Sequence, residues 1–187
     1  MSHPYCAYVA TIIDECDVDK IYHDKHYGVI IQDDNELFCR FVMEINQAGL
    51  SWRTILVKEK NFRNAYNNFD IKTVARYQEK DFARLMGDAG IIRNRLKIRA
   101  TIYNAQVLVK IQKEYGSFRK WLDIHDEKMK GMEDYSINAK KLWLREFKNN
   151  FRFVGGEIVG EFLMSIGMLP GSHGEECPIG KRIEHSV

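Results

Sequence analysis

The sequence predicts an all-α fold, arranged as a single domain over residues 1–187. Apolar residues recur at helical spacing along most of the chain, and short polar residues that cap helices precede these runs. No segment alternates apolar and polar residues convincingly enough to predict a strand. The chain has only three prolines and no long flexible linker, which argues against a second domain.

Two long apolar patterns occupy the first third of the chain. Asp33 or Asp34 caps a helix that ends at Gly49, and Ser51 caps a second helix that continues through Tyr66. The apolar positions of these two helices include Leu37, Phe38, Phe41, Ile45, Ile55, Leu56 and Phe62.

The middle of the chain continues with three predicted helices. Asp70 caps a short one, and residues 79–86 form another, which the segment 87–90 interrupts. A long helix then carries apolar residues from Ile91 onward and ends at Gly116.

The last third contains shorter helices around one polar segment. Ser117 begins a short helix around Trp121, and residues 123–134 are polar enough to be expected as a variable loop. Ser136 caps a further helix, and the Gly155–Gly156 pair opens the last apolar helix.

The composition excludes several classes of protein. Apolar residues make up 45% of the chain and charged residues 29%, as in soluble globular proteins. No apolar run reaches transmembrane length and the N-terminus lacks a signal sequence, so we expect a cytoplasmic protein without membrane contact. The net charge of +2 does not by itself imply nucleic acid. Four cysteines without an export signal favour reduced thiols or metal ligands over disulfides.

Two cysteines and two histidines near the chain ends form a candidate metal site. Cys6 and His23 lie near the N-terminus, while His173 and Cys177 lie near the C-terminus. Two thiolates and two imidazoles suit a closed tetrahedral zinc site that would join segments 1–25 and 170–180. The alternative is two buried cysteines and two ordinary surface histidines, and spacing alone does not decide between them.

One carboxylate stands out on a predicted helix. Glu44 projects from the margin of an apolar face, and Trp52 follows just beyond a Gly-Leu-Ser turn. A buried carboxylate needs a donor or a cation, so the two residues would suit a flat, cationic or donor-rich ligand such as a purine base. The alternative is a boundary glutamate that reaches solvent and an ordinary core tryptophan.

The segment around residues 79–113 is typical of a helix-hairpin-helix. Gly87 and Gly90 permit a tight turn and a close backbone approach, and free N–H groups at the start of the second helix could bind phosphate. Residues 93–99 (RNRLKIR) concentrate four positive charges, of which two would face DNA. An ordinary helical corner with a solvated charged helix is the alternative.

The sequence resembles the DNA-3-methyladenine glycosylase I family of base excision repair. The motifs that carry the resemblance are residues 44–52 (EINQAGLSW), 22–24 (YHD) with Gly28, 88–93 (DAGIIR) and 151–155 (FRFVG). The resemblance extends from Cys6 to Cys177, and Cys6, His23, His173 and Cys177 fall where this family keeps its zinc ligands. The loop between Trp121 and Ser136 is shorter than usual for the family.

The resemblance implies a monomeric enzyme that flips alkylated adenine out of double-stranded DNA and hydrolyses the N-glycosidic bond of 3-methyladenine. Trp52 would stack on the base, Glu44 would accept hydrogen bonds from the edge of the base, and Tyr22 would complete the pocket. Leu50 would be a wedge into the duplex. No aspartate is assigned a nucleophilic or general-base role.

The resemblance also implies a structural Zn²⁺ and a hairpin that grips phosphate. Gly87, Gly90, Arg93 and Arg95 are the residues expected to contact DNA.

The sequence departs from the family at three aromatic positions. Tyr8 and Tyr27, expected to contact substrate, stand where the family usually has tryptophan, and Asp19 stands near a usual tyrosine. We therefore expect a less hydrophobic and slightly roomier pocket. Altered specificity for another damaged base, or lesion binding without cleavage, are the alternatives. A structural zinc module without a DNA role is a more distant one.

Overall fold

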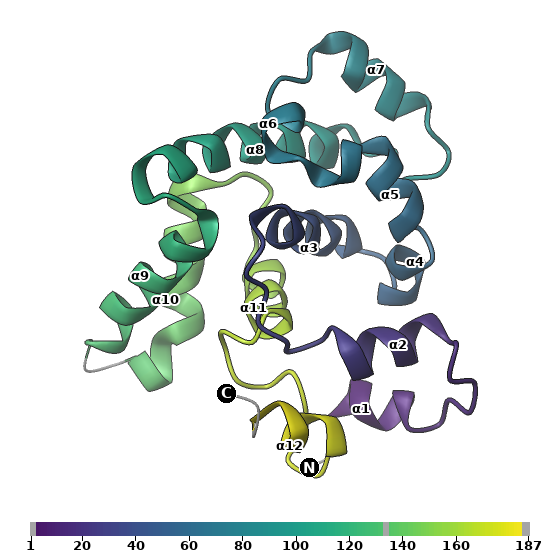
Figure 1. Ribbon diagram of the computed structural model, residues 1–187, viewed down its shortest axis with the longest axis vertical. Helices are drawn as coiled ribbons and strands as arrows, with labels where there is room; N and C mark the ends of the chain where they lie inside the picture. The colour runs from purple at the N-terminus through teal and green to yellow at the C-terminus, as the bar shows by residue number, and fades with distance from the viewer. Residues whose placement is uncertain (1–2, 133–134, 185–187) are drawn as a thin grey trace.

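The computed structural model describes residues 3–132 and 135–184, and it confirms the predicted all-α class (Figure 1). Within these residues the chain forms helices and no strand. The helices are α1 (Pro4–Val9), α2 (Val18–Lys25), α3 (Asp34–Gln47), α4 (Trp52–Leu56), α5 (Glu59–Ala65), η1 (Asn67–Phe69), α6 (Ile71–Val74), α7 (Glu79–Gly87), α8 (Arg95–Tyr115), α9 (Phe118–Lys130), α10 (Tyr135–Asn150), α11 (Gly156–Ser165) and α12 (Pro178–Glu184).

Helix α3 lies at the centre of the molecule, with α4, α8, α9 and α11 packed around it (Figure 1). Its apolar positions recur three and four residues apart, and Leu37, Phe38, Phe41 and Ile45 are fully buried. The ring of Phe41 packs against the rings of three other phenylalanines, with centroid distances of 5.1–5.5 Å. These are Phe147 on α10, Phe151 just after α10, and Phe162 on α11. This packing holds the C-terminal end of α3, which carries Glu44, in place.

The predicted helix caps at Asp33, Ser51, Asp70 and Ser117 are present, each with its side chain accepting a backbone N–H of the following helix. Asp34 instead accepts the backbone N–H groups of Phe118 and Arg119, at 2.8 and 3.0 Å. The predicted cap at Ser136 involves a side chain outside the described residues.

Three predicted boundaries are wrong. Residues 123–130, expected as a loop, belong to α9, because Phe118, Trp121, Leu122 and Met129 form a buried stripe at helical spacing. The helix expected from Ser51 to Tyr66 breaks at Val57 into α4 and α5. Helix α8 begins at Arg95 rather than near Ile91.

The late start of α8 has a local cause. Asn94 is its N-cap, and the Asn94 side chain accepts the backbone N–H groups of Leu96 and Lys97 at 3.0 and 3.2 Å. Residues 88–94 therefore form an irregular connection between α7 and α8.

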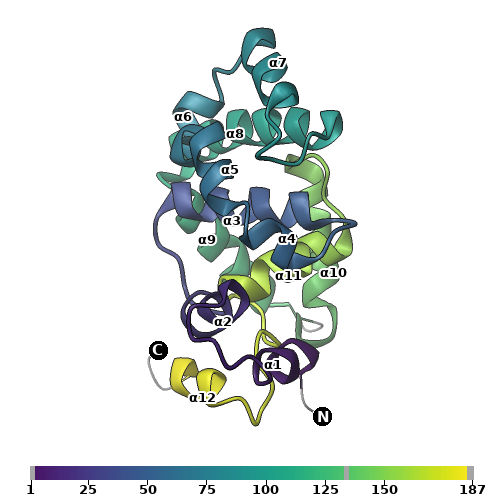
Figure 2. The same cartoon turned by 90° about the vertical axis from the view of Figure 1, so that its right-hand side faces the viewer.

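Helices α1, α2 and α12 gather at one end of the molecule, opposite α7 (Figures 1 and 2). The two ends of the chain are thus close in space although they are far apart in sequence. Among the described helices, none is both long and apolar enough to cross a lipid bilayer.

Candidate functional site

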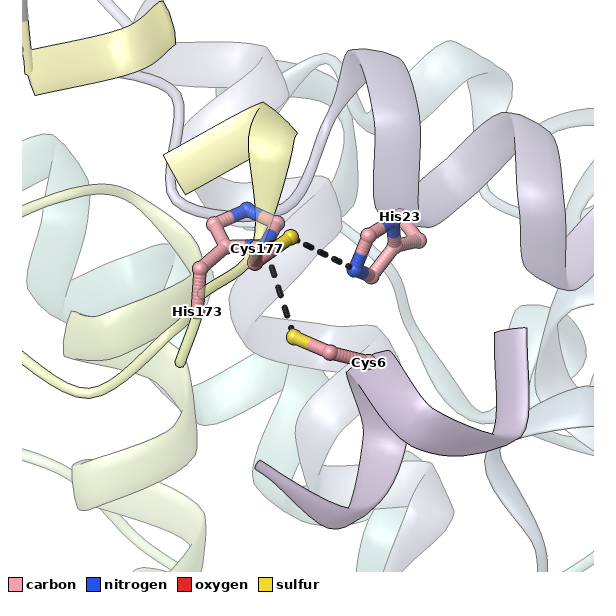
Figure 3. Close-up of side chains that lie close together, drawn as sticks. All are labelled: Cys6, His23, His173 and Cys177. Carbon is pink, nitrogen blue, oxygen red and sulfur yellow. Dashed lines mark hydrogen bonds between the residues drawn. The ribbon is translucent and has the colours of Figure 1, made fainter. Parts of the chain in front are cut away.

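The four predicted metal ligands come together where the chain ends meet (Figure 3). Cys6 is on α1, His23 is on α2, and His173 and Cys177 lie just before α12. Their ligand atoms all lie within 4.8 Å of one another. The Cys177 Sγ is 3.7 Å from His23 Nε2 and 3.5 Å from His173 Nδ1, and the Cys6 Sγ is 3.8 Å from His173 Nδ1.

These separations match the edges of a tetrahedron around a small metal ion, for which metal–sulfur and metal–nitrogen bonds of about 2.3 and 2.0 Å are typical. The remaining nitrogen of each ring has its own acceptor. His23 Nδ1 lies 2.7 Å from Asp24 Oδ1, and His173 Nε2 lies 2.9 Å from the carbonyl of Tyr27. Such outer partners orient metal-binding histidines. The group could therefore hold a metal ion.

The backbone beside this cluster leaves little room. Gly28 has φ +76°, and a Cβ at this position would lie 2.5 Å from the Ser172 Oγ. Its N–H donates to the Ser165 carbonyl at 2.9 Å. Only glycine allows the N-terminal segment to approach the segment that leads to His173 so closely.

A cavity of about 450 Å³ lies between α1, α2, the end of α3, α4 and α11. Its walls contain four aromatic side chains, Tyr5, Tyr22, Tyr27 and Trp52. Tyr22 contacts Trp52 edge-on at 5.0 Å between ring centroids, and Tyr5 meets Tyr27 edge-on at 5.7 Å. The volume and the aromatic walls suit a flat ligand, and ring faces attract cations.

Glu44 lines this cavity and is 5% exposed. Burial raises the pKa of its carboxyl from the ordinary 4.5 to about 8; the Arg40 guanidinium opposes the rise and the Glu161 carboxylate adds to it. The margin position predicted for Glu44 is thus a buried one. The indole N–H of Trp52 is also buried and has no hydrogen-bond partner among the described residues. Both groups are available to a ligand.

Arg40 stands behind this cavity. Its Nη1 donates to the Tyr22 hydroxyl at 2.8 Å, and its guanidinium lies 4.7 Å from the centre of the Tyr22 ring. A phenol oxygen that accepts from Arg40 keeps its own O–H for another acceptor. Arg40 therefore positions Tyr22 and places positive charge one helical turn before Glu44.

Tyr8, predicted to contact substrate, is not among the residues that line this cavity. It is 47% exposed and stacks on the outer side of Tyr5, with ring centroids 6.3 Å apart. Tyr5 lines the wall instead, and its hydroxyl donates to the carbonyl of Asp19 at 3.2 Å. Asp19 is buried, is ion-paired with Arg53 at 2.6 Å, and is not among the lining residues.

Leu50 lies outside the cavity, 38% exposed, in the turn that joins α3 to α4. Gly49 has φ +83° and ends α3, and the Leu50 N–H donates to the Gln47 carbonyl at 2.7 Å. An exposed apolar tip beside the cavity is compatible with the predicted wedge, which stays a prediction.

The connection 88–94 packs against the α4–α5 segment. Lys58 Nζ donates to the carbonyls of Ala89 and Gly90 at 3.2 and 3.1 Å. A Cβ on Gly90 would lie 2.9 Å from Asp88 Oδ1 and 3.1 Å from the Asn61 Cβ, whereas one on Gly87 would meet nothing. Close approach therefore requires glycine at position 90 and not at position 87.

Two of the N–H groups predicted to be free at the start of α8 are occupied, because the Asn94 side chain accepts those of Leu96 and Lys97. The Gly90 N–H is also taken, by Asp88 Oδ1 at 2.7 Å. Arg93 and Arg95 are exposed, and in the described part of the chain Arg93 makes no hydrogen bond or ion pair. Arg99 is paired with Glu79 through two hydrogen bonds of 2.6 and 2.8 Å.

Lys97 is buried, and its side chain points toward the turn between α3 and α4 instead of solvent. Its Nζ donates to the carbonyls of Asn46 and Ala48 at 2.8 and 2.7 Å, at the end of α3. Burial lowers the pKa of this ammonium below its usual range. Lys97 thereby connects the first turn of α8 to the turn between Glu44 and Trp52.

Lys97→Met is expected to lower the melting temperature, because the two carbonyls at the end of α3 would lose their buried donor. A loss of about 2 kcal/mol, or roughly 6 °C, follows for such an unsatisfied pair. Thermal unfolding followed by circular dichroism measures it. Lys113→Met, an exposed position on the same helix, should stay within about 0.5 kcal/mol of the parent, and equal melting of both variants would contradict the role of Lys97.

Comparison with known proteins agrees with this geometry. Residues 13–180 match the family model described as methyladenine glycosylase. The chain belongs to this family. It is 34% identical over 157 residues to DNA-3-methyladenine glycosylase 1 of Escherichia coli (strain K12), covering 79% of this chain and 84% of that relative. It is 30% identical over 168 residues to DNA-3-methyladenine glycosylase of Haemophilus influenzae, covering 84% and 89%.

Solved structures of methyladenine glycosylases have the same fold. A 3-methyladenine DNA glycosylase I from Staphylococcus aureus superposes with a TM-score of 0.77 at 30% identity, covering 96% of this chain and 97% of that one. A variant of 3-methyladenine DNA glycosylase I in complex with 3-methyladenine superposes with a TM-score of 0.78 at 29% identity, covering 94% and 96%.

Sequence reasoning missed Tyr5, Arg40, Glu157 and Glu161 as neighbours of the cavity. Arg40 and Glu44 are four residues apart within the otherwise apolar stretch 37–45, and Glu157 and Glu161 are four residues apart on α11. Charged pairs at this spacing share one face of a helix, and this signal could have found them.

Proposed function

We propose that this protein removes 3-methyladenine from alkylated double-stranded DNA by hydrolysing its N-glycosidic bond. The observation that carries the proposal is the aromatic cavity with the buried Glu44 carboxyl, in a chain of the methyladenine glycosylase family. A base must leave the duplex to enter such a cavity.

The chemistry suits the lining. An adenine alkylated at N3 and still joined to deoxyribose is a cation, and it leaves as a neutral base with the electron pair of the bond to C1′. Water adds to C1′ and releases a proton. In the proposed pocket Trp52 stacks on the base and Glu44 accepts from its donor edge, while Tyr22 and Tyr27 present ring faces and edges. Aspartates are absent from the described lining, so none is assigned a nucleophilic role.

We further propose that α7, the connection 88–94 and α8 act as a helix-hairpin-helix that contacts DNA phosphate through Arg93 and Arg95, with Leu50 as the wedge. The hydrogen bonds from Lys58 to Ala89 and Gly90, and from Lys97 to Ala48, support this proposal, because they connect the hairpin to the segments before and after α4, the helix that begins with Trp52. We expect the protein to act as a monomer.

Zinc is the metal that we propose for Cys6, His23, His173 and Cys177. Two thiolates and two neutral imidazoles in a closed group are the usual ligands of structural zinc. The ion would connect α1 and α2 to the segment before α12 and leave no open position for substrate.

Release of free base tests the activity. Methylated calf-thymus DNA is incubated with the protein, and the released bases are separated by chromatography. We expect 3-methyladenine in the soluble fraction. Binding to methylated DNA without base release would instead favour a lesion-binding protein, and release of a different base would favour an altered specificity.

Arg93→Glu is expected to weaken binding to all duplexes alike and to reduce the slope of log K against log salt by about one. Fluorescence anisotropy over a salt series measures both effects. Base release from a free methylated nucleoside, where measurable, should be unaffected. The control is Arg145→Glu on α10, which makes the same charge change at an exposed residue. If Arg93→Glu binds as tightly as the parent throughout the series, the proposed contact is wrong.

A further inference from the structure

Three glutamates line the cavity, although the proposed recognition of the base uses only the Glu44 carboxyl. Glu44 enters from α3, and Glu157 and Glu161 enter from α11, where they are four residues apart on one face. The described lining contains no lysine or arginine to balance them. Arg40 is the nearby cation, and it lies behind Tyr22.

Glu161 is the better placed of the two α11 carboxylates. It is half-buried, whereas Glu157 is exposed at the rim. The Tyr27 hydroxyl donates to Glu161 Oε2 at 3.3 Å, and Tyr27 itself is 5% exposed. This contact leaves Oε1 of Glu161 and the second lone pair of Oε2 without a partner among the described residues. A half-buried carboxylate on the wall of an aromatic cavity is partly shielded from water, so it attracts a cation that enters the cavity.

We propose that Glu161 is a second recognition carboxylate of this pocket, held by Tyr27, and that it selects bases that carry a full positive charge. The inference rests on the proposed function, because it takes the cavity as the site of the flipped base. Glu44 recognises the donor edge of the base, while Glu161 acts from α11 through its charge. A neutral base gains little from this second carboxylate, and a cationic base gains an attraction that the low-dielectric wall strengthens.

Two small ligands of similar shape, one cationic and one neutral, show how much the charge of the base contributes to binding. The permanently cationic 3,9-dimethyladeninium represents the alkylated nucleoside, and 3-methyladenine at pH 8 represents the neutral base. Calorimetric titration of the parent should give tighter binding of the cation. In Glu161→Gln the affinity for the cation should fall about tenfold, as for loss of one charge-assisted contact, while the affinity for the neutral base should change little.

Two further variants complete the test. Glu157→Gln makes the same change at the exposed rim, and its cation affinity should stay within about threefold of the parent. Tyr27→Phe removes the hydrogen bond but keeps the Glu161 carboxylate, so the preference for the cation should persist. If Glu161 acted only by supporting Tyr27, Tyr27→Phe and Glu161→Gln would lose the preference equally.

The proposal is overturned by an unchanged cation preference in Glu161→Gln, by equal losses in Glu161→Gln and Tyr27→Phe, or by a parent that does not prefer the cation. These outcomes are distinct from failure of the proposed function, which is a parent that releases no 3-methyladenine from methylated DNA. Normal base release with an unchanged preference in Glu161→Gln would remove only the role of Glu161.

Discussion

Replacing Cys177 with serine is expected to lower the thermal stability and the zinc content of the protein together. A metal ion that binds only the folded chain stabilises it by about 4 kcal/mol at a thousandfold excess over its dissociation constant. For a chain of this length, that corresponds to a fall in melting temperature on the order of 10 °C. Elemental analysis and differential scanning calorimetry of the same preparation measure both quantities.

The matched control is Cys16→Ser. Cys16 is exposed and lies outside the cluster of Cys6, His23, His173 and Cys177, so its replacement should change neither quantity. A strong chelator should bring the parent to the melting temperature of Cys177→Ser and leave that variant unchanged. A parent that contains no stoichiometric zinc and yet keeps its full stability would contradict the zinc proposal.

The helix caps and the metal cluster show what the sequence can predict. The caps at Asp33, Ser51, Asp70 and Ser117 depend on local hydrogen bonds, so the residue type and its position suffice. The cluster of Cys6, His23, His173 and Cys177 could be proposed at long range because few other residue types hold a metal ion.

The boundary that failed at residues 123–130 depends on packing against the core, which involves residues distant in sequence. Residues 123–130 are polar on most positions, and they remain helical because Trp121, Leu122 and Met129 reach the core. Polarity alone favoured a loop there. Similarly, the cavity wall could not be assigned between Tyr5 and Tyr8, since both stand on α1 and only packing decides which of them faces inward.

The positive segment 93–99 shows a third limit. Charge alone made Lys97 as good a DNA contact as Arg93, yet Lys97 is 4% exposed and donates to the end of α3. A cation that stabilises backbone carbonyls of another helix has no signature in the sequence, because its acceptors are carbonyls that every residue possesses.

Glu44→Gln is expected to slow the excision of 3-methyladenine by about ten- to a hundredfold. The amide lacks the charge and presents a donor where the base presents donors, and loss of a charge-assisted bond in a shielded site corresponds to roughly 1.5–3 kcal/mol. Trp52→Ala should lose a comparable amount, on the order of 1–3 kcal/mol, through lost stacking. Single-turnover excision and calorimetric binding of the free base measure the two variants.

The same Glu44→Gln substitution should stabilise the protein at high pH. Because burial raises the pKa of Glu44 to about 8, the folded state holds a proton that the unfolded state releases above about pH 4.5. The contribution of Glu44 to the unfolding free energy of the parent is therefore fully present below about pH 4.5. It is lost as the pH rises to about 8. Glutamine cannot ionise, so the difference in unfolding free energy between variant and parent should grow over this window, to a few kcal/mol.

Glu36→Gln on the same helix provides a control of opposite sign. The guanidinium of Arg63 lowers the pKa of Glu36, so the stability that this ion pair contributes is present at neutral pH and is lost as the pH falls below the ordinary range of a glutamate. Glu36→Gln should therefore be less stable than the parent at pH 7 and equal to it in acid, with excision unchanged.

If Glu44→Gln excises 3-methyladenine and binds the free base as the parent does, the base pocket lies elsewhere. A Glu44→Gln protein with the pH profile of the parent would instead mean that this carboxyl is already ionised in the folded state. A buried carboxyl that destabilises the empty protein and is needed for excision is expected of a binding group whose cationic partner arrives only with the substrate.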